Sequence, residues 1–188
     1  MDALRALGFK KDWVYETLVT TRSDKKVNAA PMGVWSADGA SVSMRVHKTA
    51  DTYGNIRKNK KFAVNFPGVV ALFYDAILEG DKLQTEGDSL FLKDCPAVLE
   101  AEVTALEDME DAVVVTARVL AYRIKKAPQL INRAEYLALD SLIAYTKLSS
   151  VPEKERDMLT ERIRENLRVI RRTALNSDFQ KLVERLLD

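Results

Sequence analysis

The chain has 188 residues but only one cysteine, Cys95, and one histidine, His47. A lone cysteine excludes an internal disulfide and fits a reducing compartment, so we expect a cytoplasmic protein. A lone histidine excludes a histidine-rich zinc site, and we expect no metal. Positive charge is not in excess, because 29 Lys and Arg residues stand against 28 Asp and Glu residues. A dedicated nucleic-acid binder usually shows a clear basic excess, so we expect no nucleic-acid partner.

Long apolar runs are also missing. None approaches the roughly 20 residues that a membrane-spanning helix needs, so we expect no membrane partner. The apolar part of the N-terminal stretch is too short, and acidic residues follow it too soon, for a secretory signal. Apolar residues make up 47% of the chain and charged residues 30%, which indicates a globular protein with a real core.

The first part of the chain has the pattern of strands. Residues 13–21, 28–36, 41–47 and 61–66 are rich in β-branched and aromatic residues. Residues 99–110 and 111–126 predict a long antiparallel pair. A short helix is expected from about residue 50, capped by Thr49 or Asp51, with Ile56 facing inward. Residues 69–78 suit either a helix or a buried strand, and residues 79–91 have the composition of an exposed loop.

After Pro128 the apolar residues recur at helical spacing. Asn132 is the expected cap of a first helix, and Ser150 the cap of a second. Asn176 or Ser177 starts a third, short helix. The second helix carries one apolar stripe, which we expect to cap the chain's own barrel-like β domain. The alternative is that it helps to cover a dimer. The stripe consists of Leu159, Ile163, Leu167 and Ile170. The predicted layout is α+β, with a β domain at residues 1–128 and a helical domain at 129–188.

The second strand contains Pro31 and Gly33, which both weaken a sheet. Proline survives in a sheet only at an edge or a bulge, and glycine there often marks the close approach of a ligand. Two interpretations stay open. The strand is either an edge whose backbone faces a flat ligand, or an edge that is blunted against aggregation.

The segment that follows is basic. Six Lys and Arg residues lie between Arg45 and Lys61, against one acid, Asp51. Lys58, Lys60 and Lys61 suit a solvated helix face. Where strand gives way to helix, the N-terminal amides, nearby cations and hydroxyls form a generic phosphate site. The residues at that junction are Arg45, Lys48, Thr49 and Thr52, with His47 among them. A flat-ligand edge followed by a phosphate site suggests a flat ring with a phosphate tail.

These two stretches, "TTRSDKKVNAAPMGV" and "MRVHKTADTYGNIRKNKKFAVNF", resemble the FMN-binding split barrel of the flavin-reductase type. Asp51, Thr52, Asn55 and Ile56 stand in the register of that family's motif, and Val64-Asn65 follows. With its helical tail the chain looks most similar to an uncharacterised flavoprotein family (a domain of unknown function) of methanogens and methylotrophs. The resemblance implies a split β-barrel with a C-terminal helical extension. The turn at residues 23–26 departs from the pattern because it lacks a glycine.

The resemblance also implies a cofactor and the residues that hold it. Main-chain atoms along the second strand would line the isoalloxazine edge of FMN, namely those of Asn28, Ala29, Ala30, Pro31, Met32, Gly33 and Val34. Side chains at the junction would hold the phosphate, namely those of Arg45, His47, Lys48, Thr49 and Thr52. Asn55 and Asn65 would be structural. Relatives of this type imply a homodimer with flavin near the subunit interface and a small-molecule electron donor or acceptor.

The resulting hypothesis is an FMN-dependent oxidoreductase that transfers hydride or electrons through bound FMN. The alternative is a non-catalytic FMN-binding or electron-carrier protein. A third hypothesis, nucleic-acid binding through residues 57–61, ranks last because acidic clusters elsewhere cancel the field. We expect Cys95 to be an ordinary buried or loop thiol, and the acids at residues 100–102 and 107–111 to be strand and turn surface.

Overall fold

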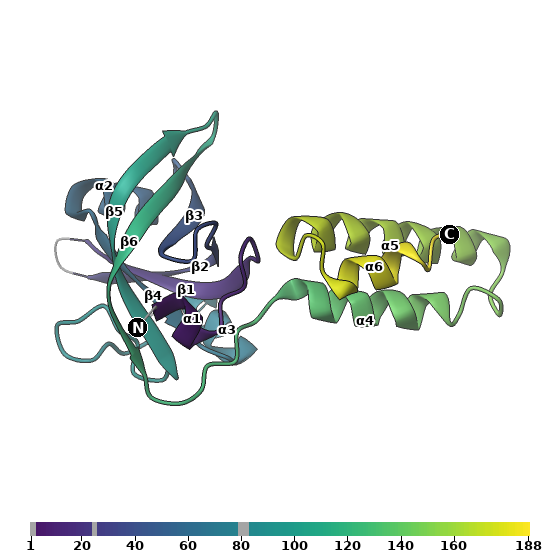
Figure 1. The fold of residues 1–188 in the computed structure, drawn as a ribbon, viewed down its shortest axis with the longest axis horizontal. Helices are drawn as coiled ribbons and strands as arrows, with labels where there is room; N and C mark the ends of the chain where they lie inside the picture. Colours follow the sequence, from purple (N-terminus) through teal and green to yellow (C-terminus); the bar gives the residue numbers. More distant parts are fainter. Residues whose placement is uncertain (1–2, 24–25, 79–82) are drawn as a thin grey trace. The chain divides into compact units, whose positions relative to one another are not determined.

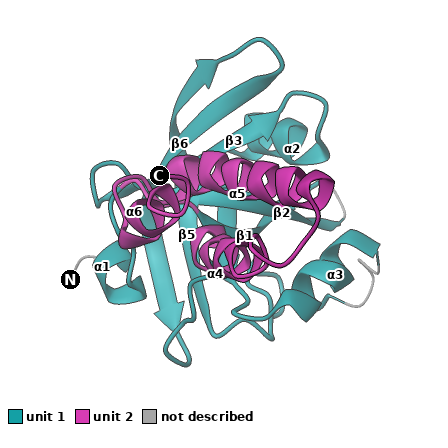
Figure 2. Ribbon diagram, turned by 90° about the vertical axis from the view of Figure 1, so that its right-hand side faces the viewer, with its two compact units in different colours: residues 1–11, 15–131 teal, residues 12–14, 132–188 magenta. Residues whose placement is uncertain are grey.

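The computed structural model describes residues 3–23, 26–78 and 83–188 (Figure 1). The chain forms two compact units, residues 1–11 with 15–131 and residues 12–14 with 132–188 (Figure 2). The expected domain boundary between residues 128 and 129 stays a prediction. None of the helices in the described residues is long and apolar enough to cross a membrane.

Unit 1 is a closed antiparallel barrel with the strand order β1-β2-β3-β6-β5-β4. Its strands are β1 (Tyr15–Arg22), β2 (Val27–Trp35), β3 (Ser41–His47), β4 (Lys61–Phe66), β5 (Ala97–Asp108) and β6 (Ala112–Ile124). Alternate residues of each strand point inward and form the core, which includes Val19, Met44, Val64, Leu99 and Val115. With the helices that follow, the α+β split-barrel prediction is confirmed.

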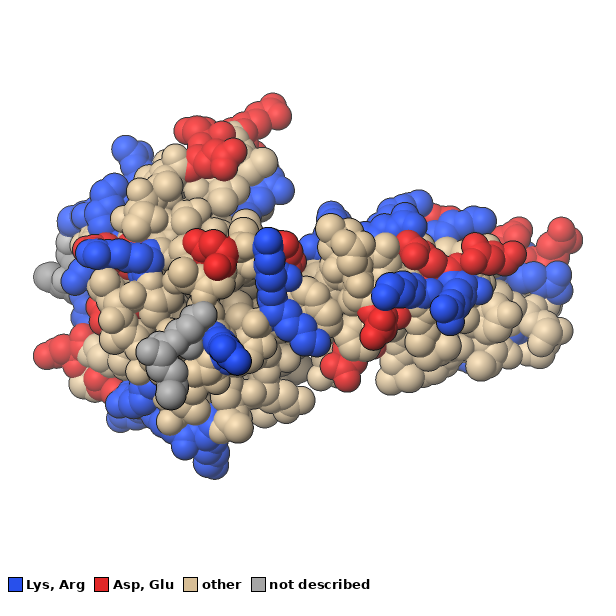
Figure 3. Space-filling view, in the orientation of Figure 1, with Lys and Arg blue, Asp and Glu red and all other residues tan. Residues whose placement is uncertain are grey.

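The long pair predicted near the end of unit 1 is also confirmed. β5 and β6 pair from Ala97↔Ile124 to Asp108↔Val113, with register shifts at Glu100/Ala101 and Val103/Ala105. The hairpin extends beyond the rest of the barrel (Figure 1), and acidic side chains gather at its tip (Figure 3). The acids in this turn are Glu107, Asp108, Glu110 and Asp111.

The described part of unit 1 contains the helices α1 (Ala3–Leu7), α2 (Asp51–Asn59) and α3 (Val70–Leu78). In the segment 69–78, for which strand and helix were both open, residues 70–78 therefore form a helix. Ala50 takes the extended N-cap position of α2, and no side chain caps the helix, so the expected cap by Thr49 or Asp51 was wrong. Lys60 ends the helix with a left-handed backbone, φ 59°. Ile56 is fully buried, as predicted.

Residues 83–95, here called the arm, lie over the outer face of the barrel. A bridge joins Thr85 to Leu92, and Leu92 packs with Leu18, Cys95 and Val98 in a second small core. The predicted loop is confirmed for residues 83–91, which are all exposed or half-buried, while the buried Leu92 and Cys95 lie beyond it and supply the apolar cover of β1 and β5. The rest of that predicted loop, residues 79–82, lies outside the described residues.

Unit 2 contains α4 (Arg133–Tyr145), α5 (Glu153–Thr173) and α6 (Asp178–Glu184). Asn132 caps α4 by accepting from the Ala134 amide at 2.7 Å, as predicted. Ser177 caps α6 by accepting from Gln180. Ser150 does not cap α5. Pro152 takes the N-cap position, while the Ser150 hydroxyl donates to the Lys147 carbonyl.

The apolar stripe of α5 is used inside unit 2. Ile163, Leu167 and Ile170 are buried in a core shared with α4 and α6. The expectation that this stripe caps the barrel was wrong, because α4 presents small residues that let α5 pack closely. These are Ala134, Ala138, Ser141 and Ala144, all buried.

Candidate functional site

The edge of β2 is free along most of its length. β2 pairs with β1 from Val27↔Arg22 to Val34↔Tyr15. Its pairs with β3 are limited to Val34↔Met44 and Trp35↔Ser43. Residues 27–33 therefore have no strand partner on one side among the described residues. This gap is the split in the barrel.

The register shows which main-chain groups point into that gap. The Glu16 amide donates to the Ile131 carbonyl at 2.9 Å, on the side of β1 away from β2. Because backbone groups alternate along an antiparallel strand, the bonds from β1 to β2 come from the neighbours of Glu16. In β2 the free groups then belong to Val27, Ala29, Pro31 and Gly33. Pro31 lacks its amide at a position where β1 needs none, which explains how the sheet tolerates it.

α2 is fastened beside β2 by asparagine side chains. The Asn28 Nδ2 donates to the Thr52 Oγ1 at 3.0 Å, and Thr52 is 1% exposed. The Asn55 Nδ2 donates to the Thr21 Oγ1 at 3.0 Å, so Asn55 has a structural role, as expected. No acceptor among the described residues meets the first amides of α2, those of Asp51 and Thr52. The start of the helix is therefore held near β2 with free donors.

The basic residues of the predicted site turn toward the β5–β6 hairpin instead. Arg45 donates to Asp111 at 2.7 Å, and the His47 Nδ1 lies 3.4 Å from the same carboxylate. Lys48 pairs with Asp108 and also donates to the Met109 carbonyl. The Arg45 guanidinium holds the pKa of Asp111 below its usual value. Thr49 is exposed in the turn before α2.

The structure thus divides the predicted site residues into two groups. It brings Asn28 and Thr52 into contact beside the free edge of β2. It gathers Arg45, His47 and Lys48 around the acidic turn of the hairpin. Alternation along β3 explains this, because residues 45 and 47 face outward while Met44 and Val46 enter the core.

A cavity of about 210 Å³ lies at the start of this edge. Val27, Asn28 and Ala29 of β2 line it together with Ala76 of α3 and with Leu83, Thr85 and Leu92 of the arm. The sequence analysis missed the last four residues. They carry no local pattern that points to a ligand, and only the tertiary position of α3 and the arm brings them to β2.

α3 presents a large apolar surface next to this cavity. None of its residues is buried, and Val70, Tyr74, Ile77 and Leu78 are 75%, 54%, 63% and 65% exposed. An apolar patch of this kind on a globular unit usually marks an interaction surface. We call these four residues the α3 face.

Among the residues that the structure describes, neither the cysteine nor the histidine of the chain lies at the β2 edge. Cys95 is 1% exposed, and burial raises the pKa of its thiol to about 12, so the prediction of an inert buried thiol is confirmed. His47 faces the hairpin. Within residues 3–23, 26–78 and 83–188, no three His, Cys, Asp or Glu side chains gather as metal ligands would.

Known proteins match the chain in sequence and in structure. The family profile described as "Protein of unknown function (DUF447) N-terminal domain" matches residues 15–126. The profile described as "Protein of unknown function (DUF447)" matches residues 132–188.

Three solved structures illustrate the likeness in fold. An FMN-bound protein of the DUF447 family from Methanosarcina mazei superposes with a TM-score of 0.54 at 22% identity, over 98% of this chain and 97% of that one. An FMN-binding protein from Thermus thermophilus gives 0.51 at 20% identity, over 59% and 70% of the two chains. A flavin reductase in complex with NADP+ gives 0.53 at 19% identity, over 67% and 88%.

Proposed function

The chain belongs to the DUF447 family, and from this premise we propose that it binds FMN along the free edge of β2. The family's FMN-bound member from Methanosarcina mazei has the same fold over nearly the full length of both chains. In this chain the observation that carries the proposal is the unpaired edge at residues 27–33. Its main-chain donors and acceptors need partners that the described strands do not supply.

The residues along the edge fit a flat, polar ring. The amides and carbonyls of Ala29 and Gly33 point to the open side, where a ring can form hydrogen bonds with them in one plane. Asn28, Ala30, Met32 and Val34 bind β1 and keep the edge straight. Pro31 has no amide, so it contributes only its carbonyl acceptor to the edge. The edge is therefore a fixed row of polar groups with little side-chain bulk between them.

The start of α2 suits the phosphate. Its first two amides are free, the helix end carries partial positive charge, and the Thr52 hydroxyl is fixed by Asn28. We therefore assign the phosphate to the start of α2, where the Asp51 amide and the exposed Thr49 hydroxyl can reach it, while the buried Thr52 holds Asn28 in place. Arg45, His47 and Lys48 would have to exchange Asp111 and Asp108 for the phosphate, so they make the smaller contribution.

A homodimer would complete the site. The cavity beside β2 is smaller than the roughly 300–1,000 Å³ of typical ligand pockets, so one protomer can enclose only part of FMN. α3 borders this cavity through Ala76, and the α3 face is the surface that a second copy would cover. Burial of its exposed side chains would also stabilise the pair.

Bound FMN would supply hydride or electron transfer between a small-molecule donor and an acceptor. The protein's part would be to hold the ring, to donate main-chain hydrogen bonds to it and to exclude water with α3 and the arm. An oxidoreductase is the function that this arrangement supports best. The second candidate is an FMN carrier without turnover, which the lack of a cysteine or histidine at the described part of the edge favours.

A matched pair of proline variants tests the site. Ala29→Pro removes an amide that points to the free edge and places a ring where FMN would lie, so we expect a folded protein that no longer retains flavin. Ala30→Pro removes an amide that bonds to β1, so it should disrupt the β1–β2 ladder. Circular dichroism reports the fold, and absorbance in the blue reports bound flavin. A folded Ala29→Pro variant that retains flavin would contradict the proposal.

Turnover separates the two candidates. The flavin-loaded protein is reduced photochemically, and reoxidation is followed with oxidised nicotinamide or deazaflavin acceptors. Exchange with one of them supports the oxidoreductase. Failure with all of them, while flavin stays bound, supports the carrier.

A further inference from the structure

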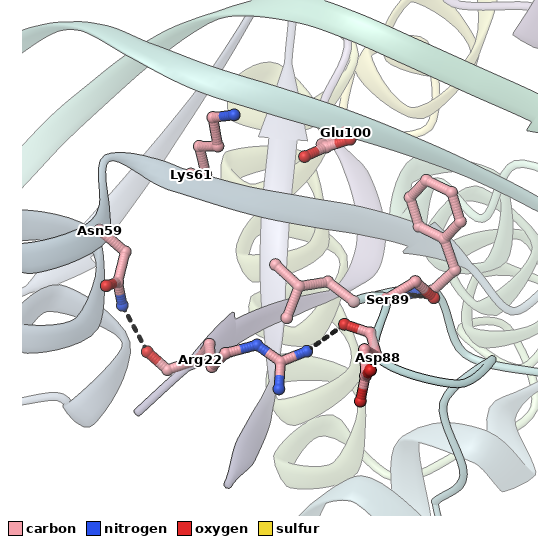
Figure 4. Close-up of a pocket in the computed structure, with 8 residues that line it drawn as sticks. Arg22, Asn59, Lys61, Asp88, Ser89 and Glu100 are labelled. Atoms are coloured by element: carbon pink, nitrogen blue, oxygen red, sulfur yellow. Dashed lines mark hydrogen bonds between the residues drawn. The ribbon is translucent and has the colours of Figure 1, made fainter. Parts of the chain in front are cut away.

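A second cavity, of about 340 Å³, is lined by residues of β1, β4, β5 and the arm (Figure 4). It contains none of the residues assigned to FMN. Its lining consists of Arg22, Asn59, Lys61, Asp88, Ser89, Leu90, Phe91 and Glu100. Its size is at the lower end of the range for small-molecule sites.

The cavity exists because the arm covers only half of the outer face of the barrel. Leu18 and Val98 point outward and are buried beneath the arm. Farther along the same faces of β1 and β5 come Arg22 and Glu100, and Lys61 lies beside them at the start of β4. This charged half is open, with the arm as its wall.

The arm, which forms the wall of the cavity, is attached to the barrel on both sides, so the cavity does not depend on a ligand for its shape. Asn65 is fully buried, and its Oδ1 accepts from the Leu92 amide at 2.8 Å. The Thr20 hydroxyl donates to the Leu90 carbonyl. On the far side Glu86 pairs with Arg123 and Lys125, and these two cations lower the pKa of its carboxyl.

The charged side chains of the cavity form no direct ion pair with a described residue, although the charge of Lys61 acts, after that of Arg118, to lower the pKa of Glu102. Neither Arg22 nor Lys61 forms an ion pair with any residue that the structure describes, and neither does Glu100. Arg22 donates to the Asp88 carbonyl, and its own carbonyl accepts from Asn59 at 2.6 Å. By contrast, the neighbouring Glu102 is paired with Arg118.

The arrangement separates the charges around the hollow. Figure 4 shows Lys61 and Glu100 on one side and the Arg22 guanidinium on the other, while the Asp88 side chain points away from them. Leu90 and Phe91 add an apolar wall, and Arg123 lies 5.3 Å from the ring centre of Phe91. A cation and a carboxylate on the same side, together with an apolar and aromatic wall, are the complement of a small zwitterion with an apolar group.

We propose that this cavity binds a small amphipathic zwitterion of the α-amino acid class. Lys61 holds its carboxylate, the adjacent Glu100 holds its ammonium group, and Leu90 and Phe91 contact its side chain, while Arg22 closes the opposite side of the cavity. The site is independent of FMN, because it shares no residue with the β2 edge.

Three probes that differ in one group test this on the full-length protein. Phenylalanine, 3-phenyllactate and 3-phenylpropionate carry the same ring and carboxylate, with an ammonium, a hydroxyl or neither. By calorimetry we expect phenylalanine to bind up to about fivefold more tightly than 3-phenylpropionate, because its ammonium group gains one partly exposed ion pair with Glu100. Glu100→Gln should remove this preference and leave 3-phenylpropionate unaffected.

Lys61→Met should weaken all three probes about fivefold, because it removes a carboxylate partner. Lys60→Met is the matched control, since Lys60 is the adjacent lysine but does not line the cavity, and it should change nothing. Amide NMR of the native chain gives a readout without variants, with shifts expected at residues 88–91. Absence of any binding at about 10 mM would overturn the site. Equal affinity for phenylalanine and 3-phenylpropionate would overturn the zwitterion assignment.

Discussion

Replacement of Asn65 by leucine tests how the arm is held to the barrel. Asn65 is fully buried between β1 and the arm. Its Nδ2 donates to the Leu18 carbonyl at 3.1 Å and to the Thr20 hydroxyl at 2.9 Å, and its Oδ1 accepts from the Leu92 amide at 2.8 Å. Leucine has a similar size but can replace none of these bonds.

The expected cost follows from those three contacts. The Leu92 amide would be left buried without an acceptor, at about 1–3 kcal/mol, and each lost Nδ2 bond would add about 0.5–1.5 kcal/mol. The total, roughly 2–6 kcal/mol, is a large part of the 5–15 kcal/mol typical of a domain. The rate of amide hydrogen exchange in the arm should also rise, because residues 83–95 lose their central attachment.

Urea unfolding measures the free energy, and hydrogen exchange measures the opening of the arm. Asn59→Ala is the control, because Asn59 is exposed and its bond to the Arg22 carbonyl is solvated, so its loss should cost less than about 1 kcal/mol. An Asn65→Leu variant within 1 kcal/mol of the native chain, with normal exchange at Leu92, would refute the reasoning.

Three further predictions concern single side chains. Thr49→Val should weaken FMN retention roughly three- to tenfold, and more than Arg45→Ala does, because Asp111 already engages Arg45; equilibrium dialysis measures this, and the reverse order would contradict the phosphate assignment. The pKa of Asp38 should be about 2 by NMR titration, because the amides of Ala40 and Ser41 donate to its carboxylate. Its contribution to stability is complete above its ordinary pKa of 3.8 and is lost as the pH falls through about 2, whereas a midpoint near 3.8 would show that those bonds are absent. Cys95 should not react with a thiol reagent at pH 8 in the native state and should react after unfolding, since its pKa is about 12; fast native labelling would show that the arm opens.

The strands could be predicted because each carries its own local pattern. Residues 41–47 alternate between outward and core positions, and residues 61–66 enter the core at Phe62, Val64 and Phe66. Pro31 and Gly33 marked β2 as an unusual edge before its register was known. Caps with a side-chain acceptor, Asn132 and Ser177, were equally readable.

Features that depend on tertiary position were not readable. The basic cluster after β3 suggested one phosphate site, but strand alternation sends Arg45 and His47 to the face that meets Asp111. The loop at residues 83–91 was predicted, but its polar residues gave no sign that Leu92 and Cys95, just beyond it, cover Leu18 and Val98. The apolar stripe of α5 correctly predicted that one face of this helix is buried. Its partners, α4 and α6, could not be predicted from the stripe alone.

Amide NMR of the native chain with added FMN tests the central claim most directly. The account predicts that FMN shifts the amide signals of Val27, Ala29 and Gly33, which point to the free edge, more than those of Asn28, Ala30 and Met32, which bond to β1. It also predicts shifts at Asp51 and Thr52. Saturation with FMN that leaves these edge amides unchanged would contradict it.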